Sequence, residues 1–157
     1  MNLEARPSDA LVFFGATGDL AHKKIYPALQ ALTRDGALDM PVIGVARAGW
    51  TVEQLRDHVR DSLGQGEQGI DEAAFAQLAA NLRYIDGDYQ DPSTFDRLKR
   101  QLDADGVRRP LHYLAIPPAL FGTVVKALGA SGCADGARVV VEKPFGHDLA
   151  SAQALNR

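Results

Sequence analysis

The chain has 157 residues, of which 46% are hydrophobic and 24% charged, and its formal net charge is −3. This composition is typical of one globular domain and excludes a disordered chain, which would hold fewer apolar residues and more net charge. The mildly acidic balance argues against a nucleic-acid surface. No apolar run approaches the roughly 20 residues that cross a bilayer. From the charge and the apolar runs together, we expect neither a nucleic-acid nor a membrane partner.

The single cysteine, Cys133, cannot form an intrachain disulfide. The polar N-terminus also lacks the pattern of a signal peptide. Both observations favour a reducing compartment, and we expect a cytoplasmic location.

Short apolar runs alternate with longer amphipathic segments along the chain. The apolar runs predict strands at 11–14, 42–46, 82–85, 111–116 and 139–142. The amphipathic segments predict helices at 20–34, 51–63, 71–81, 92–102 and 119–128, with a last one from 148 onward. Because such an alternation needs crossover connections, the sequence predicts a Rossmann-like, doubly wound α/β fold, with a parallel sheet between two helical layers.

Local signals support several of these elements. The first strand, Leu11-Val12-Phe13-Phe14, is a continuous apolar run, as expected for a strand buried on both faces. In the first helix, four aliphatic side chains recur at near-helical spacing: Leu20, Ile25, Leu29 and Leu32. Thr51 followed by Gln54 is a capping-box pattern, and Asp91-Pro92 places a cap before a proline at the first helical position.

A glycine-containing turn, residues 15–21 (G-A-T-G-D-L-A), links the first strand to the first helix. Open α/β sheets bind nucleotides at this place, because the amides and the dipole of the helix N-terminus point outward there. Gly15 would permit the tight turn, Gly18 the close approach of a pyrophosphate, and Ala21 the close packing of helix and strand. The spacing differs from G-x-G-x-x-G and from a P-loop, so a plain βα turn capped by Asp19 stays open.

Three basic residues, His22-Lys23-Lys24, follow this turn and oppose the helix macrodipole. Such charges fit either a nearby anionic ligand or a solvated helix face.

The residue after the second strand distinguishes between the two nicotinamide coenzymes. An NAD site places Asp or Glu there to accept from the ribose hydroxyls, whereas here Arg47 follows and no carboxylate occurs before Glu53. A guanidinium suits the 2′-phosphate of NADP, with the Thr17 hydroxyl as a second partner. NADP is therefore favoured over NAD, and an ordinary surface arginine is the alternative.

The last predicted strand ends in Glu142-Lys143-Pro144, at the sheet edge where ligands bind in this architecture. Lys143 would hold a phosphate or a hydroxyl, or move a proton. A structural charged pair with Glu142 is the alternative.

Tyr113 on the fourth strand is a further candidate for lining the coenzyme cleft, and Asp88-Tyr89 after the third strand for reaching the adenosine side. A packed core tyrosine and a turn carboxylate are the respective alternatives. The four histidines are His22, His58, His112 and His147. They show no metal-ligand spacing with Cys133 or with one another, so no metal site is expected.

Taken together, these segments resemble the coenzyme domain of glucose-6-phosphate dehydrogenase. The matching stretches are F-G-A-T-G-D-L-A at 14–21, K-K-I-Y-P at 23–27, V-A-R at 45–47, Y-L-A-I-P-P at 113–118 and V-E-K-P-F-G at 141–146. They occur in the family's order, and the first and last of them form a highly specific combination. His22 stands where the family commonly has lysine or arginine, so we expect one weaker phosphate contact.

The resemblance implies oxidation of D-glucose 6-phosphate at C1 to 6-phosphogluconolactone, with hydride transfer to NADP, at the entry to the oxidative pentose phosphate pathway. It also implies that residues 15–22 (Gly15, Ala16, Thr17, Gly18, Asp19, Leu20, Ala21 and His22) cradle the pyrophosphate and that Arg47 reads the adenosine phosphate. Tyr113 would line the coenzyme site. Lys143 would contact both sugar and coenzyme, before a cis peptide to Pro144.

The family's general base is a histidine in a downstream segment of the pattern R-I-D-H-Y-L-G-K-E, which this sequence does not contain. The family's β-sheet substrate domain is also absent. We therefore expect residues 1–157 to form an NADP-binding domain that is inactive alone and part of a homo-oligomer only with the C-terminal domain.

Two alternatives remain. One is a stand-alone NADP-binding or regulatory module without catalysis. The other is the glucose–fructose oxidoreductase group, which resembles the chain at Lys143-Pro144 but generally uses a G-x-G-x-x-G turn.

Overall fold

The computed structural model describes residues 7–19 and 21–141. Within these ranges, five parallel strands form one sheet in the order β3-β2-β1-β4-β5. The strands are β1 (Ala10–Phe14), β2 (Val42–Ala46), β3 (Leu82–Asp86), β4 (Pro110–Leu114) and β5 (Arg138–Val141). The strand order changes direction between β1 and β4, which is the topology of a doubly wound fold, and confirms the predicted fold class.

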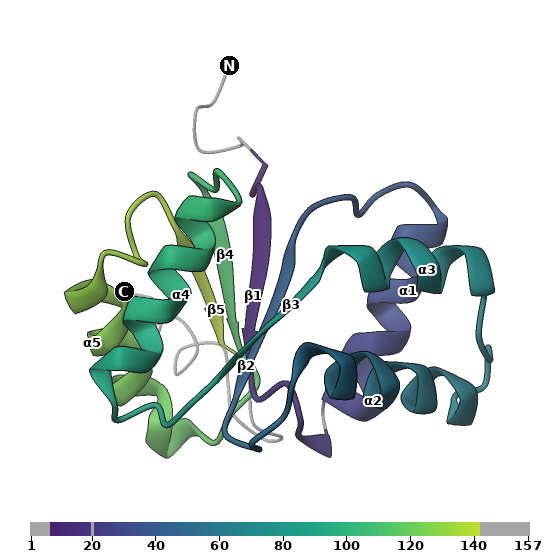
Figure 1. The fold of residues 1–157 in the computed structure, drawn as a ribbon, viewed down its shortest axis with the longest axis horizontal. Coiled ribbons are helices and arrows are strands. Elements are labelled where there is room, and N and C mark those ends of the chain that lie inside the picture. The colour runs from purple at the N-terminus through teal and green to yellow at the C-terminus, as the bar shows by residue number, and fades with distance from the viewer. Residues whose placement is uncertain (1–6, 20, 142–157) are drawn as a thin grey trace, which may run out of the picture.

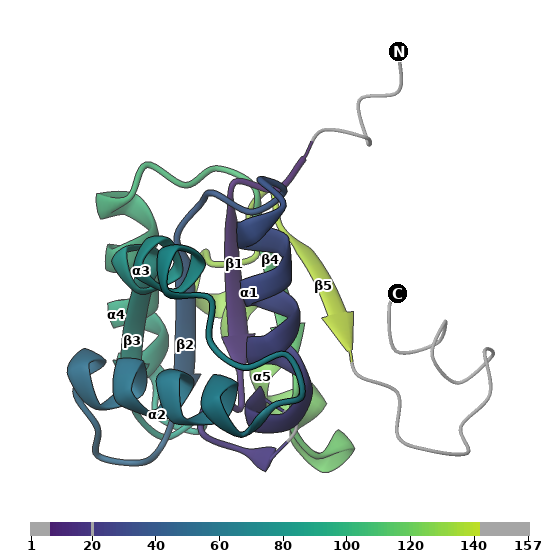
Figure 2. The same cartoon turned by 90° about the vertical axis from the view of Figure 1, so that its right-hand side faces the viewer.

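Helices cover both faces of the sheet (Figure 1). One layer consists of α1 (Tyr26–Arg34), α2 (Val52–Gln65) and α3 (Glu72–Asn81), and the other of α4 (Pro92–Ala104) and α5 (Phe121–Ser131). Figure 2 shows α1, α2 and α3 in front of the sheet, with α4 and α5 behind it. The predicted three-layer arrangement is therefore confirmed.

The central strand β1 supplies both hydrophobic cores. Its five residues are all buried. Leu11 and Phe13 pack with the residues of α1, α2 and α3, whereas Val12 and Phe14 pack with those of α4 and α5. Burial of one such side chain stabilises the folded state by roughly 1.5–3 kcal/mol. Because both faces of β1 are buried, every residue of the strand is apolar.

The capping signals predicted for two helices are confirmed. The Thr51 hydroxyl accepts from Gln54 N (3.3 Å), while the Gln54 side chain accepts from Thr51 N (2.8 Å), which completes the capping box of α2. Asp91 accepts from Ser93 N (2.9 Å) and is followed by Pro92 as the first residue of α4. These contacts satisfy amides that have no partner inside the helix.

The first helix differs from its prediction. Residues Ala21–Ile25 form a π-helical turn, labelled η2, and α1 begins only at Tyr26. The side chain predicted at the end of the apolar stripe, Leu32, is 44% exposed, whereas Tyr26 is fully buried and its hydroxyl donates to the carbonyl of Ala16. The buried face of α1 consists of Tyr26, Leu29, Gln30 and Thr33, and Leu32 lies beside this face.

The fourth strand ends at Leu114 rather than Ile116, because its partner β1 ends opposite it at Phe14. A 3-10 turn, Pro118–Leu120, then precedes α5. Glu142 and the helix predicted from Asp148 lie outside the described residues. In the described ranges, no helix has the length and apolar character needed to span a membrane.

Candidate functional site

The candidate residues gather at the carboxyl edge of the sheet. Gly15 directly follows β1, Arg47 follows β2, and Asp88 lies shortly after the end of β3. Because these strands are parallel neighbours, the three connections leave the sheet at the same edge. The fifth strand ends at Val141, close in sequence to Lys143, which lies outside the described residues, as does the peptide to Pro144.

The turn at residues 15–21, here called the glycine turn, begins with a residue that only glycine can fill. Gly15 has a φ of +91°, and a β-carbon there would lie 2.1 Å from the carbonyl oxygen of Ala115. The Gly15 N–H is shared between the Val45 carbonyl (3.0 Å) and the Tyr89 hydroxyl (2.8 Å). The fold itself therefore dictates this glycine, whatever the site binds.

Tyr89 ties three segments of this edge together. Its hydroxyl accepts from Gly15 N and donates to the Val45 carbonyl (3.1 Å), while its ring packs edge-on against Phe14 with centroids 5.8 Å apart. Burial raises the pKa of Tyr89 to about 12, partly offset by the hydrogen bond from Gly15, so the phenol stays a neutral donor. The sequence placed Tyr89 on the adenosine side and carried no signal for this structural role.

Gly18 differs from Gly15, because the packing of the protein does not require it. Among the described residues, a β-carbon at Gly18 would meet only the Gly15 carbonyl oxygen, at the ordinary contact distance of 3.4 Å. The surface above Gly18 is exposed, as is Asp19, while Thr17 is half-buried. The two alanines of the turn, Ala16 and Ala21, are fully buried, and Leu20 lies outside the described residues.

The side chain of His22 is engaged by α2. Its Nε2 lies 3.1 Å from Gln65 Oε1, and because this oxygen accepts, Nε2 carries the proton. The His22 carbonyl accepts from the buried Ser62 hydroxyl, and the His22 ring lies 5.1 Å from that of His58. The neighbouring Lys23 and Lys24 are exposed.

Burial lowers the pKa of His58, and His22 acts in the same direction, while Asp61 partly opposes them. His58 and Ser62 were not identified from the sequence. Both residues lie on α2, and Ser62 is 40 positions from His22, so no local sequence pattern connects them with the glycine turn.

Arg47 opens a second loop, residues 47–50, here called the arginine loop. Its side chain is 77% exposed, and Nη1 lies 3.1 Å from Asp88 Oδ2. The loop itself is held by Asp86, whose Oδ1 accepts from Ala48 N (2.9 Å) and Gly49 N (2.8 Å).

No sequence pattern pointed to Asp86. Although burial acts to raise it, the pKa of Asp86 lies below its usual range, because the Tyr84 hydroxyl (2.5 Å) and the backbone amides of Ala48, Gly49 and Trp50 donate to its carboxylate. An ionised Asp86 thus fixes the loop that presents Arg47.

Tyr113 lies on the α1 side of the sheet, in register with Phe13. It is half-buried against the core of that face and lines a cavity of about 230 Å³, together with Lys24 of the π turn and Ala28 of α1. This position is compatible with either interpretation of Tyr113, as a core tyrosine or as part of a cleft wall.

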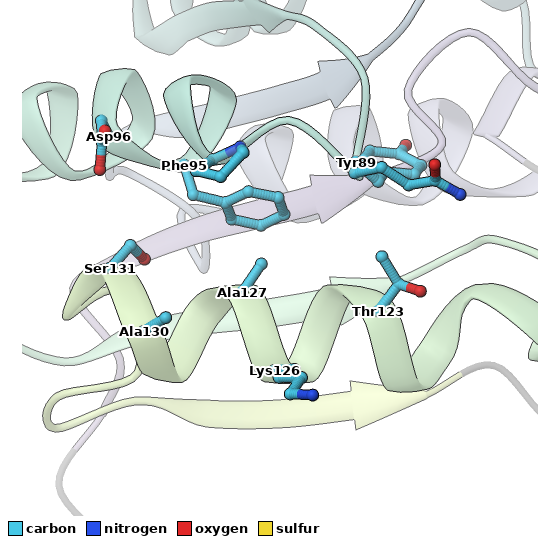
Figure 3. A pocket seen from close by; sticks show the side chains of 10 residues that line it. Tyr89, Phe95, Asp96, Thr123, Lys126, Ala127, Ala130 and Ser131 are labelled. Atoms are coloured by element: carbon cyan, nitrogen blue, oxygen red, sulfur yellow. The ribbon is translucent and has the colours of Figure 1, made fainter.

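On the opposite face, a groove of about 440 Å³ separates α4 from α5 (Figure 3). Tyr89 and Phe95 line one side, and Thr123, Lys126 and Ala127 of α5 line the other. Tyr89 therefore contributes its hydroxyl to the glycine turn and its ring to this groove. In the part of the chain that the structure describes, no group of three or more His, Cys, Asp or Glu residues is placed to hold a metal ion.

Comparisons with known proteins identify the family. Residues 12–157 match the family model described as glucose-6-phosphate dehydrogenase, NAD binding domain. Glucose-6-phosphate 1-dehydrogenase 1 of Mycobacterium tuberculosis is 48% identical over 149 residues, covering 95% of this chain and 31% of the relative. The enzyme of Saccharomyces cerevisiae is 39% identical over 155 residues, covering 92% of this chain and 31% of the relative.

Solved structures agree with this result. The crystal structure of glucose-6-phosphate 1-dehydrogenase from Mycobacterium avium superposes with a TM-score of 0.85 at 45% identity, covering 96% of this chain and 33% of that one. A glucose-6-phosphate dehydrogenase in complex with its substrate gives 0.78 at 34% identity, covering 96% and 34%.

The chain thus spans about a third of the length of the relatives that it matches. The matched family model supports a nicotinamide dinucleotide as the class of cofactor. The chain belongs to the family of glucose-6-phosphate dehydrogenase NAD-binding domains.

Proposed function

We propose that the carboxyl edge of this sheet binds NADP. The observation that carries the proposal is the juxtaposition of the glycine turn with Arg47, at the ends of the adjacent strands β1 and β2. Backbone amides at a helix N-terminus suit a pyrophosphate, and a guanidinium suits a 2′-phosphate. In this arrangement residues 15–22 hold the pyrophosphate, Arg47 and Thr17 bind the adenosine phosphate, and Asp88, Tyr89 and Tyr113 line the remainder.

The geometry of the glycine turn fits this ligand. Gly18 leaves an exposed surface that no contact within residues 7–19 and 21–141 requires, which suits the close approach of a pyrophosphate to the backbone. Arg47 lies at the same edge with its guanidinium open to solvent. His22 contributes less to phosphate binding than a lysine would, because its ring is turned to Gln65 and His58.

We further propose that this domain serves the oxidation of D-glucose 6-phosphate at C1 to 6-phosphogluconolactone, the entry step of the oxidative pentose phosphate pathway. Family membership and the names of the relatives support this activity. The bound coenzyme supplies the hydride acceptor. Lys143 contacts the sugar and the coenzyme, while the C1 hydroxyl proton passes to a histidine base in a downstream segment of the complete enzyme.

These roles imply partners and a location. We propose glucose 6-phosphate as the substrate of the complete enzyme, a homo-oligomer formed through its C-terminal domain, and a cytoplasmic location. The single cysteine, Cys133, is buried as a free thiol, and burial raises its pKa and keeps it protonated.

Calorimetric titration of the 157-residue chain with NADP and with NAD tests the coenzyme assignment. Replacing Arg47 by Ala should weaken NADP binding by on the order of 1–3 kcal/mol and NAD binding by less. The matched control is Arg100→Ala, which removes an exposed arginine from the middle of α4. Equal losses for the two coenzymes would show that Arg47 does not read the phosphate.

Turnover tests the roles outside the described residues. The 157-residue chain should form no NADPH from NADP and glucose 6-phosphate, because it lacks the downstream base. In the complete enzyme, Lys143→Ala should lower kcat strongly, whereas the control Lys126→Ala on α5 should leave it unchanged. Unaltered kinetics of the Lys143→Ala enzyme would reject the proposed contact.

A further inference from the structure

A carboxylate that the sequence lacks at the end of β2 is supplied by the next strand. No acidic residue follows Arg47 before Glu53, but β3 pairs with β2 in parallel register, with Ala46 opposite Asp86. Asp88 therefore emerges beside Arg47, and its Oδ2 lies 3.1 Å from the guanidinium. The two residues are separated by 41 positions in the sequence.

The Asp88 carboxylate is held in place for this contact. Its Oδ1 accepts from Gln90 N (2.9 Å), while its carbonyl accepts from the Thr94 hydroxyl (2.9 Å). One carboxylate oxygen is thus fixed by the backbone, and the other faces Arg47. The side chains of Arg47 and Asp88 are 77% and 41% exposed, so a ligand can reach both.

The other nearby carboxylate is not available to a ligand in the same way. Asp86 receives hydrogen bonds from Ala48 N, Gly49 N and the Tyr84 hydroxyl, which shape the arginine loop. Asp88 is therefore the carboxylate of this pair of residues that faces the proposed 2′ position of the adenosine ribose.

We propose that Asp88 is a specificity-determining residue that lets this site accept NAD as well as NADP. The inference rests on the proposed coenzyme site. When NADP binds, its 2′-phosphate competes with Asp88 for Arg47, and the two anions repel each other. When NAD binds, Asp88 accepts a hydrogen bond from the 2′-hydroxyl and remains the counterion of Arg47. One carboxylate thus weakens the binding of one coenzyme and strengthens that of the other.

The test is Asp88→Asn, which removes the charge and keeps the shape of the side chain. Calorimetry on the 157-residue chain should show NADP binding about three- to tenfold tighter and NAD binding about threefold weaker than in the unaltered chain. Adenosine 2′,5′-bisphosphate and 5′-AMP should repeat this divergence, because they carry only the part of the ligand that differs. The gain for NADP should shrink as salt is added.

The matched control is Asp103→Asn. It removes a carboxylate that pairs with Lys99 (2.9 Å) at the C-terminal end of α4, on the opposite edge of the sheet. Both coenzymes should bind this variant as they bind the unaltered chain.

Two results would overturn the inference. In one, Asp88→Asn leaves the ratio of the two dissociation constants unchanged. In the other, it weakens NADP binding as Arg47→Ala does, which would make Asp88 a positioning residue for the guanidinium. Failure of the coenzyme site itself is recognised differently, since the unaltered chain would then bind neither dinucleotide, or Arg47→Ala would leave its NADP affinity unchanged.

Discussion

The glycine turn and the arginine loop lie at the same edge of the sheet but are stabilised in different ways. In the glycine turn, Ala16 and Ala21 are fully buried, and the Ala115 carbonyl just after β4 leaves no room for a β-carbon at Gly15. In the arginine loop, the exposed Arg47 is attached by charge-assisted hydrogen bonds, its own to Asp88 and those that Asp86 accepts. The first depends on packing and the second on charge.

This difference separates two tasks under the proposed function. The pyrophosphate, which NAD and NADP share, would meet a backbone that cannot move without disturbing the core. The 2′ group, which distinguishes them, would meet exposed side chains that can be exchanged at little cost in stability. Substitutions in the two regions should therefore affect folding and coenzyme choice to very different degrees.

The largest effect is expected for Gly15→Ala. The new β-carbon would collide with the Ala115 carbonyl at 2.1 Å and would require a left-handed φ of an L-residue. We expect the free energy of unfolding to fall by about 3 kcal/mol or more, measured by urea denaturation.

Gly36→Ala is the matched control, since Gly36 also has a positive φ (+76°), but in the described part of the chain no atom would lie within 4 Å of its β-carbon. It should cost only about 1 kcal/mol. Similar losses for the two variants would mean that the glycine turn yields to the added carbon, and would remove the contrast with the arginine loop.

The next effect concerns pH and the packing behind the glycine turn. Burial lowers the pKa of His58, with His22 adding to the effect, so the folded protein binds fewer protons than the unfolded chain. The free energy of unfolding should therefore be highest above about pH 6.5, the pKa of a histidine in the unfolded chain. It should fall as the pH drops below that value. The slope per histidine is at most about 1.4 kcal/mol per pH unit.

Denaturation at several pH values checks this expectation, with His58→Gln giving a shallower slope. His112 contributes in the same direction, since burial lowers its pKa more than the hydrogen bond to the Cys133 carbonyl raises it. His112→Gln therefore serves as the comparison on the other face of the sheet. A slope unchanged by either variant would contradict the assignment.

Tyr89→Phe should have a smaller effect, about 1 kcal/mol. The variant loses the hydroxyl that bridges Gly15 N and the Val45 carbonyl, but Gly15 N keeps its direct bond to Val45 (3.0 Å). Hydrogen exchange should show faster exchange at the Gly15 amide. Tyr84→Phe should instead accelerate exchange at Ala48 and Gly49, and acceleration of both regions by one variant would show that they are not independent.

The smallest effect on stability is expected for Arg47→Ala. Its side chain is 77% exposed and its ion pair with Asp88 is open to solvent, so the free energy of unfolding should change by less than about 0.5 kcal/mol. Loss of NADP preference without loss of stability would sharpen the contrast between the two regions. A larger destabilisation, seen in urea denaturation, would show that Arg47 helps to hold the fold.

Much of the fold could be predicted from sequence, because its signals are local. The apolar run of β1 and the capping box at Thr51 depend on residues within one element, and both appear as expected. The π turn at Ala21–Ile25 was not predicted, since it depends on the buried Tyr26 hydroxyl and on Ser62 of α2. Leu32 belongs to the predicted apolar pattern but lies outside the buried face of α1, which Tyr26, Leu29, Gln30 and Thr33 form.

In the candidate site, too, the positions of residues next to a strand could be predicted, whereas contacts between distant residues could not. Gly15 and Arg47 follow strands that can be recognised by their composition, so their place at one edge was predictable. The contacts of Tyr89 with Gly15 and of Asp88 with Arg47 span 74 and 41 positions. No periodicity relates such residues, because the register between separate strands determines which of them meet.

The pairing of β1 with β4 has a consequence for synthesis on the ribosome. Asp9 accepts a hydrogen bond from Arg109 N, 100 positions later, and the carbonyl that closes over Gly15 belongs to Ala115. Contacts of such sequence separation form late, whereas β1, β2 and β3 can pair as soon as they emerge. We therefore expect a nascent chain without β4 to expose the hydrogen-bonding edge of β1 that β4 later covers. The glycine turn leaves the ribosome early, but it would be completed only after β4 and Ala115 have emerged.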